Sequence, residues 1–182
     1  MKITLNAVIP KNFEWIARIA RDEYSKTLAS AAEGQYREIG RQFAVEDALA
    51  SGETWKSFQT SPIEVRGDRM QVSLYPTGDR AKVMAFIEFG RRPGKMPPPA
   101  AIREWLEAKG WIGKGEEGTH VDAIIWSVAR GIGEYGIEPK HLLEKAENRY
   151  KPNIVRMFEA ATRRIARRVN SRLKTKSTIR KG

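Results

Sequence analysis

The chain has 182 residues, no cysteine, and 33 Lys and Arg against 22 Asp and Glu, for a formal net charge of +11. The lack of cysteine excludes disulfides and thiolate metal sites, and no apolar run approaches the ~20 residues of a membrane-spanning helix. The N-terminal segment lacks the apolar core of a signal peptide, so we expect a soluble cytoplasmic product. A chain of this length is expected to fold as a single domain, over residues 1–173.

The net charge is concentrated at one end of the sequence. Residues 149–182 hold twelve Lys or Arg and one acid, Glu159, whereas residues 1–148 hold 21 residues of each sign. Ordinary protein surfaces intersperse both signs, so the imbalance indicates that this segment meets a polyanion or is held on something that does. Binding of this kind would not depend on base sequence.

The first third of the chain predicts a strand and a long helix. Residues 2–9 alternate between apolar and polar side chains, which is the period of a half-buried strand. From Asn12 to Phe43 apolar residues recur every three or four positions, which predicts one long helix. Gly34 and Gly40 lie inside this stripe, each costs about 1 kcal/mol relative to Ala, and together they are candidates to split the helix.

The middle of the chain predicts a small sheet. Apolar residues alternate on both sides of Arg66-Gly67-Asp68, which predicts a hairpin. Residues 82–89 are apolar on both faces, which favours a central strand. We therefore expect an α+β fold, in which a small antiparallel sheet (the hairpin plus the central strand) is packed by a long N-terminal helix and a long C-terminal helix.

A proline-dense loop over residues 90–99 follows, with three positive charges and no acid. Its backbone is expected to stay extended, because proline cannot continue a hydrogen-bonded ladder. The loop is a candidate for contact with a neighbouring subunit. The residues concerned are Arg91, Arg92, Pro93, Lys95 and Met96.

After two shorter helices, the last helix is expected to run from about Lys140 to Leu173, with Pro152 as a kink or restart. Its apolar stripe leaves the basic residues on the remaining face, and residues 174–182 are expected to form a basic, flexible tail. The candidates for contact with DNA or a protein partner are Arg156, Arg163, Arg164, Arg167, Arg168, Arg172 and Lys174.

The sequence contains no recognisable catalytic motif. His120 and His141 lack a metal-ligand spacing, and nucleophile-elbow and phosphate-loop patterns are absent. Glu116 and Glu117 are adjacent in a glycine-flanked loop, which suits solvated side chains better than paired acid–base work. We therefore expect no catalytic residues, no metal site and no cofactor, and a metal nuclease is the weakest of the functional alternatives.

Several short segments occur in a familiar order. Gly52 and Ser57 precede the hairpin, and Glu88-Phe89-Gly90 precedes the loop that begins with Arg91-Arg92-Pro93-Gly94. This order resembles the tail-component family typified by gene product 10 of phage HK97, the neck or tail-completion proteins of tailed phages. The resemblance covers roughly residues 11–165, and strand 2–9 and the extended basic C-terminus are less typical of the family.

The resemblance implies a structural virion protein without catalytic residues. Such a protein would form a homo-oligomeric ring, such as a hexamer or dodecamer, that joins the head connector to the tail around the DNA channel. It would reside in the neck of the virion, pass through the host cytoplasm during assembly, and contact other connector and tail proteins but no membrane. The basic helix could line the channel or dock on an acidic partner. The alternative is a free, non-sequence-specific nucleic-acid-binding protein that acts through its basic C-terminal helix.

Overall fold

The computed structural model describes residues 2–8, 14–46, 48 and 52–179, with side chains as far as Lys174. The chain forms two compact units. Unit 1 comprises residues 39–59 and 76–146, and unit 2 comprises residues 2–38, 60–75 and 147–182. The expectation of one domain over residues 1–173 stays a prediction, because the same two long helices run through both units.

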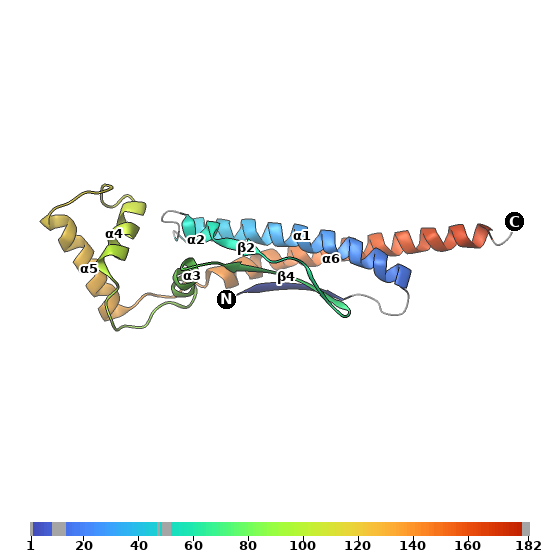
Figure 1. Cartoon of the computed structure of the whole chain (residues 1–182), viewed down its shortest axis with the longest axis horizontal. Helices are drawn as coiled ribbons and strands as arrows, with labels where there is room; N and C mark the ends of the chain where they lie inside the picture. The colour runs from blue at the N-terminus through green and yellow to red at the C-terminus, as the bar shows by residue number, and fades with distance from the viewer. Residues whose placement is uncertain (1, 9–13, 47, 49–51, 180–182) are drawn as a thin grey trace. The chain divides into compact units, whose positions relative to one another are not determined.

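The α+β class is confirmed, with a small antiparallel sheet and long N- and C-terminal helices. The strand order is β1-β4-β2, and β3 also pairs with β4. No helix within the described residues is both long and apolar enough to cross a membrane. The described elements, shown in Figure 1, are in chain order β1 (Ile3–Val8), α1 (Glu14–Val45), α2 (Glu53–Lys56), β2 (Phe58–Thr60), β3 (Glu64–Arg66), β4 (Arg69–Pro76), α3 (Arg80–Phe89), α4 (Pro99–Ala108), α5 (Thr119–Tyr135) and α6 (Leu142–Ile179).

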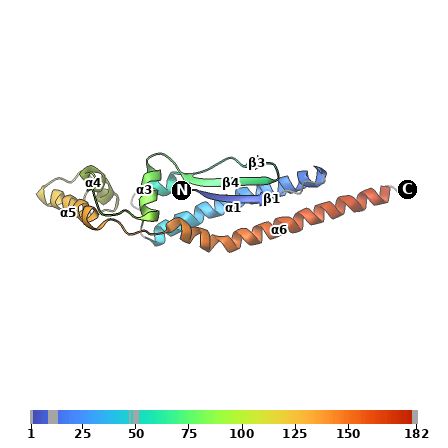
Figure 2. The ribbon, with the colours of Figure 1, turned by 90° about the horizontal axis from the view of Figure 1, so that it is seen from below.

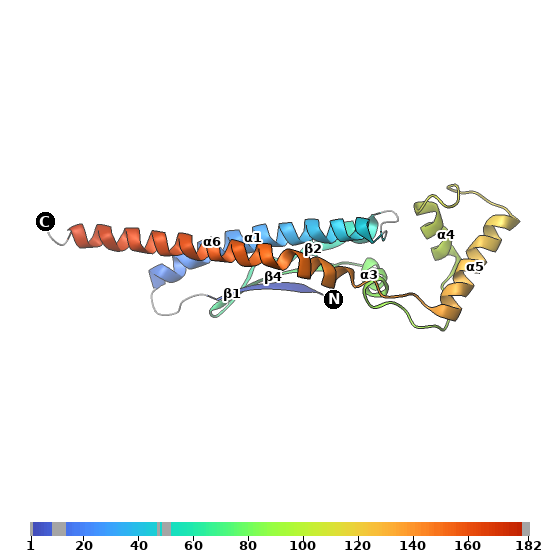
Figure 3. The ribbon, with the colours of Figure 1, turned by 180° about the vertical axis from the view of Figure 1, so that it is seen from behind.

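The sheet of unit 2 presents one apolar face. In the antiparallel pairing of β1 with β4, Ile3 lies opposite Leu74 and Leu5 lies opposite Val72, and all four side chains are buried. Strand residues two apart share a face, so this register collects the apolar side chains on one side. Figures 2 and 3 show α1 and α6 running side by side along these strands. The core of unit 2 lies between the sheet and the two helices.

The predicted hairpin is confirmed. Strand β3 pairs with β4 so that Arg66 lies opposite Arg69, and Gly67 takes a φ of 64° in the two-residue turn between them. Glycine tolerates this conformation because it has no Cβ.

The central strand predicted over residues 82–89 is wrong, because these residues form α3. A short apolar run does not distinguish a buried strand from a helix by its periodicity. In the helix only one face is buried, and it carries Met84 and Glu88, four residues apart. Phe86 and Phe89 are exposed, so the run is not covered on both faces as a central strand would be.

The two glycines in α1 do not split the helix, which is continuous from Glu14 to Val45. They make room for aromatic side chains. A Cβ added at Gly34 would lie 1.7 Å from the hydroxyl oxygen of Tyr150, and one added at Gly40 would lie 2.5 Å from a ring carbon of Trp55. The tight contact of each glycine with a ring explains why a residue with poor helix propensity stands at these positions.

Helix α6 is longer than predicted. It passes through Pro152 without a break and continues to Ile179, beyond the predicted end at Leu173. The flexibility expected of residues 174–182 stays a prediction. The absence of an apolar stripe beyond Leu173 led to the wrong boundary, because the backbone hydrogen bonds of a helix do not require such a stripe. Residues 180–182 lie outside the described residues.

Candidate nucleic-acid interface

The whole net charge belongs to unit 2. This unit holds 20 Lys or Arg against 9 Asp or Glu, whereas unit 1 holds 13 of each sign. Helix α6 supplies most of the surplus in unit 2. The candidate interface is therefore on α6, and the question is which of its cations are available to a partner.

The basic residues of α6 fall on two faces. At 3.6 residues per turn, Arg156, Arg163 and Arg167 project within about 40° of one another around the helix axis. We call these three residues the outer stripe. Arg164 and Arg168, which we call the inner pair, project from a neighbouring face, and their contacts are with α1.

The inner pair is bound to two carboxylates of α1. Nε of Arg164 donates to Oε2 of Glu23 at 2.8 Å. Nη1 of Arg168 donates to Oδ2 of Asp22 at 2.8 Å and to Oε1 of Glu23 at 2.9 Å. These hydrogen bonds lower the pKa of both carboxyl groups, that of Asp22 chiefly through Arg168 and that of Glu23 chiefly through Arg164. The inner pair therefore holds α6 on α1 and is already neutralised.

Two further sequence candidates lie beyond this pair. The guanidinium of Arg172 lies 5.5 Å from the ring centroid of Trp15 on α1, which is a cation–π distance. Lys174 lies seven residues after Arg167, in line with the outer stripe, and it is exposed. Arg172 thus belongs to the contact between the two helices, while Lys174 extends the outer row.

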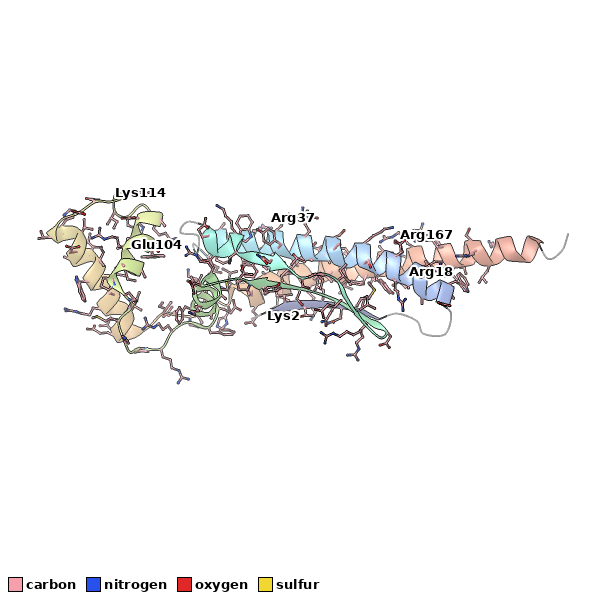
Figure 4. The ribbon with its side chains drawn as sticks, viewed as in Figure 1. Lys2, Arg18, Arg37, Glu104, Lys114 and Arg167 are labelled. Carbon is pink, nitrogen blue, oxygen red and sulfur yellow. The ribbon has the colours of Figure 1, made fainter. Side chains whose placement is uncertain are left out.

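The outer stripe is exposed and largely without acidic partners. Arg156 and Arg167 make no hydrogen bond or ion pair with any other described residue. Nη1 of Arg163 lies 4.0 Å from Oε2 of Glu159, and both side chains are more than half exposed. An exposed pair at this distance contributes little. Figure 4 labels Arg167 on the C-terminal part of α6.

A hollow of about 420 Å³ lies next to the outer stripe. Its lining combines α1 and α6 and includes three arginines. The lining residues are Ile19, Arg167, Arg168, Ser171 and Arg172. A concave surface with several guanidinium groups is suited to an anionic group such as a phosphate.

The loop candidates of unit 1 divide in a similar way. Arg91 faces its own chain, because its guanidinium donates to the carbonyl of Lys95 and lies 6.0 Å from the ring centroid of Phe86. The backbone of Arg91 also exchanges two hydrogen bonds of 2.8 Å with Ile137. Arg92, Pro93, Lys95 and Met96 are exposed. The loop is also held at Gly94, whose backbone N–H donates to the carbonyl of Gly133 at 2.7 Å. Of the five candidates, Arg91 is therefore an anchor and the other four are exposed.

Unit 1 also exposes large apolar side chains. Among them are Trp111 at 63% exposure, Trp126 at 50% and Tyr135 at 81%. Both tryptophans therefore lie outside the core. Exposed aromatic side chains on a unit without net charge are typical of surfaces that contact other proteins.

The described residues contain no group of three or more metal-ligating side chains that could hold an ion. His120 lies 3.3 Å from Glu116, and His141 lies 3.5 Å from Glu144, so each imidazole is next to a carboxylate of its own segment. The backbone N–H of Gly113 donates to Glu116 at 2.6 Å and lowers the pKa of that carboxyl group. The contacts of these histidines and glutamates are therefore with residues close to them in the sequence, in the loop before α5 and at the start of α6.

Comparisons with protein-family models, with curated proteins and with solved structures found no match to this chain.

Proposed function

We propose that this chain is a structural component of a tailed-phage virion, a neck or tail-completion protein that joins the head connector to the tail as a homo-oligomeric ring around the DNA channel. The observation that carries the proposal is the separation of two kinds of surface. Unit 2 bears the outer stripe of exposed cations, and unit 1 is neutral and exposes aromatic side chains. A ring around DNA needs one surface for neighbouring subunits and another that accepts the nucleic acid.

The motif residues behind the resemblance support the proposal through their structural roles. Gly52 precedes α2 with a φ of 78°. Oγ of Ser57 donates to the carbonyl of Thr54 at 2.7 Å, and the carbonyl of Ser57 accepts from Thr77. A Cβ on Gly90 would lie 2.4 Å from the carbonyl oxygen of Ile137. The motifs therefore act in the architecture, as expected for a structural protein whose motif carries no chemistry.

The proposed ring uses heterologous contacts, in which one patch of a subunit meets a different patch of the next. The exposed part of the 90–96 loop and the aromatic side chains of unit 1 are the surfaces we assign to neighbouring subunits or to connector and tail proteins. Because unit 1 has no net charge, its association is not opposed by net charge repulsion.

Electron microscopy of phage particles whose genome encodes this chain tests the proposal. The expected result is a ring of copies at the head–tail junction, and particles from a deletion mutant are expected to contain unjoined heads and tails. Complete, infectious particles without any copy of the chain would overturn the proposal.

The second candidate is a free, non-sequence-specific nucleic-acid-binding protein, which the outer stripe favours by itself. The deletion experiment separates the two functions, because this candidate predicts normal head–tail joining in the mutant. The second candidate also predicts that, after sedimentation of a lysate, the protein is found with nucleic acid rather than with phage particles.

A further inference from the structure

We propose that the outer stripe of α6 binds the sugar–phosphate backbone of duplex DNA, whereas the inner pair acts only in holding α6 on α1. The inference deepens the proposed function and rests on it for the choice of DNA as the polyanion. It assigns different roles to arginines that are one position apart in the sequence, Arg163 and Arg164 on one turn and Arg167 and Arg168 on the next.

The cations of the outer stripe are available to a ligand, whereas those of the inner pair are not. The inner pair already donates short hydrogen bonds to Asp22 and Glu23. A phosphate that recruited these guanidinium groups would have to break hydrogen bonds to carboxylates, one of which belongs to a buried residue. The outer stripe needs no such exchange, because Arg156 and Arg167 have no partner among the described residues and Arg163 has only the long contact to Glu159.

The spacing of the outer stripe matches the spacing of phosphates along a DNA duplex. Arg156 and Arg167 are eleven residues apart, which corresponds to about 16 Å along a helix. A DNA duplex carries roughly ten phosphates over this length, so three guanidinium groups in one row can each reach a phosphate without bending the DNA. The guanidinium group can also donate two parallel hydrogen bonds to one phosphate.

The surroundings of the outer stripe favour a duplex over a single strand. Proteins that bind single strands combine positive charge with aromatic side chains on which the bases stack. After Phe158 the sequence contains no aromatic residue, and Ala160, Asn170 and Ser171 lie beside the stripe. Two aromatic rings lie near it, and each already has a partner within the chain: Phe158 packs on Tyr24 with ring centroids 5.8 Å apart, and Arg172 lies over Trp15. Because both rings are engaged, contact with a backbone is favoured over stacking on bases, and duplex DNA over a single strand.

The hollow beside the outer stripe is suited to one phosphate group. Arg167, Arg168 and Arg172 line it together with Ser171, and of these guanidinium groups that of Arg168 is already bound to Asp22 and Glu23. A phosphate placed there would be within reach of a free guanidinium group and of the one that lies over Trp15. This makes Arg167 the residue of the stripe whose loss is expected to weaken binding most.

Fluorescence anisotropy of a mixed-sequence duplex, titrated with the full chain at several NaCl concentrations, tests the proposal. The variant R156Q/R163Q/R167Q is expected to reduce the slope of log affinity against log salt by about 2.7, since each phosphate contact in duplex DNA contributes about 0.9. Thermal unfolding by circular dichroism is expected to be unchanged, because the three side chains are exposed.

A matched control removes three exposed cations from unit 1. The variant K82Q/K114Q/R130Q has the same net charge as the stripe variant and is expected to keep the wild-type slope and an affinity within about two-fold. A second control, R164Q/R168Q, is expected to lower the unfolding temperature while the folded variant keeps the wild-type slope.

Four outcomes would overturn the proposal: a wild-type slope in the stripe variant, equal losses in the stripe variant and the unit 1 control, tighter binding of a single strand than of a duplex, or preferential binding of polyglutamate. None of these outcomes excludes the neck function, which complete, infectious particles without the chain would exclude.

Discussion

The carboxylate of Glu88 caps the first turn of α6, where it accepts the backbone N–H of Leu143 at 2.7 Å and that of Glu144 at 3.2 Å. Glu88 is 3% exposed. The first N–H groups of a helix have no partner within the helix, and a negative charge is stabilising at that end. The end of α3 thereby fixes the start of the long C-terminal helix, 55 residues further along the chain.

Replacing Glu88 is expected to destabilise the protein. Glu88→Ala leaves two N–H groups without an acceptor in a buried place, and the free energy of unfolding is expected to fall by about 2–3 kcal/mol. Glu88→Gln keeps one acceptor oxygen, so its loss is expected to be smaller. Urea denaturation followed by circular dichroism measures both values. An alanine variant as stable as the wild type would show that the cap contributes nothing.

Gly136 is expected to tolerate no side chain. It has a φ of 79°, and an added Cβ would lie 2.1 Å from the carbonyl oxygen of Arg91. Gly136→Ala is expected to lower the free energy of unfolding by more than about 2 kcal/mol, because strain in a left-handed conformation adds to a clash with backbone.

Gly131→Ala is the matched control for this substitution. Gly131 lies within α5, and an added Cβ would meet nothing within 4 Å. The change is expected to raise stability by about 0.5–1 kcal/mol, the usual gain for alanine in a helix. Equal effects at the two glycines would contradict the packing argument.

The contact between α1 and α6 is expected to weaken in acid. Hydrogen bonds from Arg164 and Arg168 hold the pKa of Glu23 below its ordinary value of 4.5. The folded state therefore binds this proton less tightly than the unfolded state. The stabilisation is fully present above about pH 4.5 and is lost as the pH falls through the lowered pKa.

Glu23→Gln tests this dependence. Unfolding temperatures of the wild type and the variant are expected to differ most near neutral pH and to converge as the pH falls below 4.5 and through the lowered pKa of Glu23. Glu33→Gln, the same change at an exposed position of α1, serves as the control. A constant difference between wild type and Glu23→Gln at all pH values would contradict the assignment.

Gln35 is expected to be a position where stability can be gained. Its side chain is fully buried in α1, and neither its amide nitrogen nor its amide oxygen has a hydrogen-bond partner among the described residues. A buried polar group without a partner costs about 1–3 kcal/mol, so Gln35→Leu, of similar size, is expected to raise the free energy of unfolding by about that amount. A drop in stability would indicate that the amide groups are satisfied in solution.

The sequence predicted the elements whose pattern has one physical meaning. The alternation in residues 2–9 and on both sides of Gly67 is typical of strands with one covered face. The structure contains β1, both strands of the hairpin and the turn between them. The apolar run over residues 82–89 fits a strand or a helix, and the contact that decides between them is with a segment far away in the sequence. Glu88 is buried because the N-terminus of α6 meets it there, and nothing in the local pattern indicates that contact.

The sequence indicated which helix carries the candidate interface, but it did not indicate that the arginines of this helix divide into an exposed row and a pair bound to α1. The count of charges identified α6, and the spacing of seven and four residues that joins Arg156, Arg163 and Arg167 was visible in the sequence. The separation of Arg164 and Arg168 from this row depends on Asp22 and Glu23, more than 140 residues earlier. Such a pairing is decided by the way the two helices pack and not by the period of either one.

The confinement of the net charge to unit 2 affects how copies of this protein meet. Two copies that approach through unit 2 bring surfaces of +11 each together, while unit 1 offers a surface without net repulsion. Salt at physiological strength screens such repulsion beyond about 8 Å. The close approach of two copies through unit 2 is therefore opposed by charge, and a polyanion bound to α6 reduces this opposition.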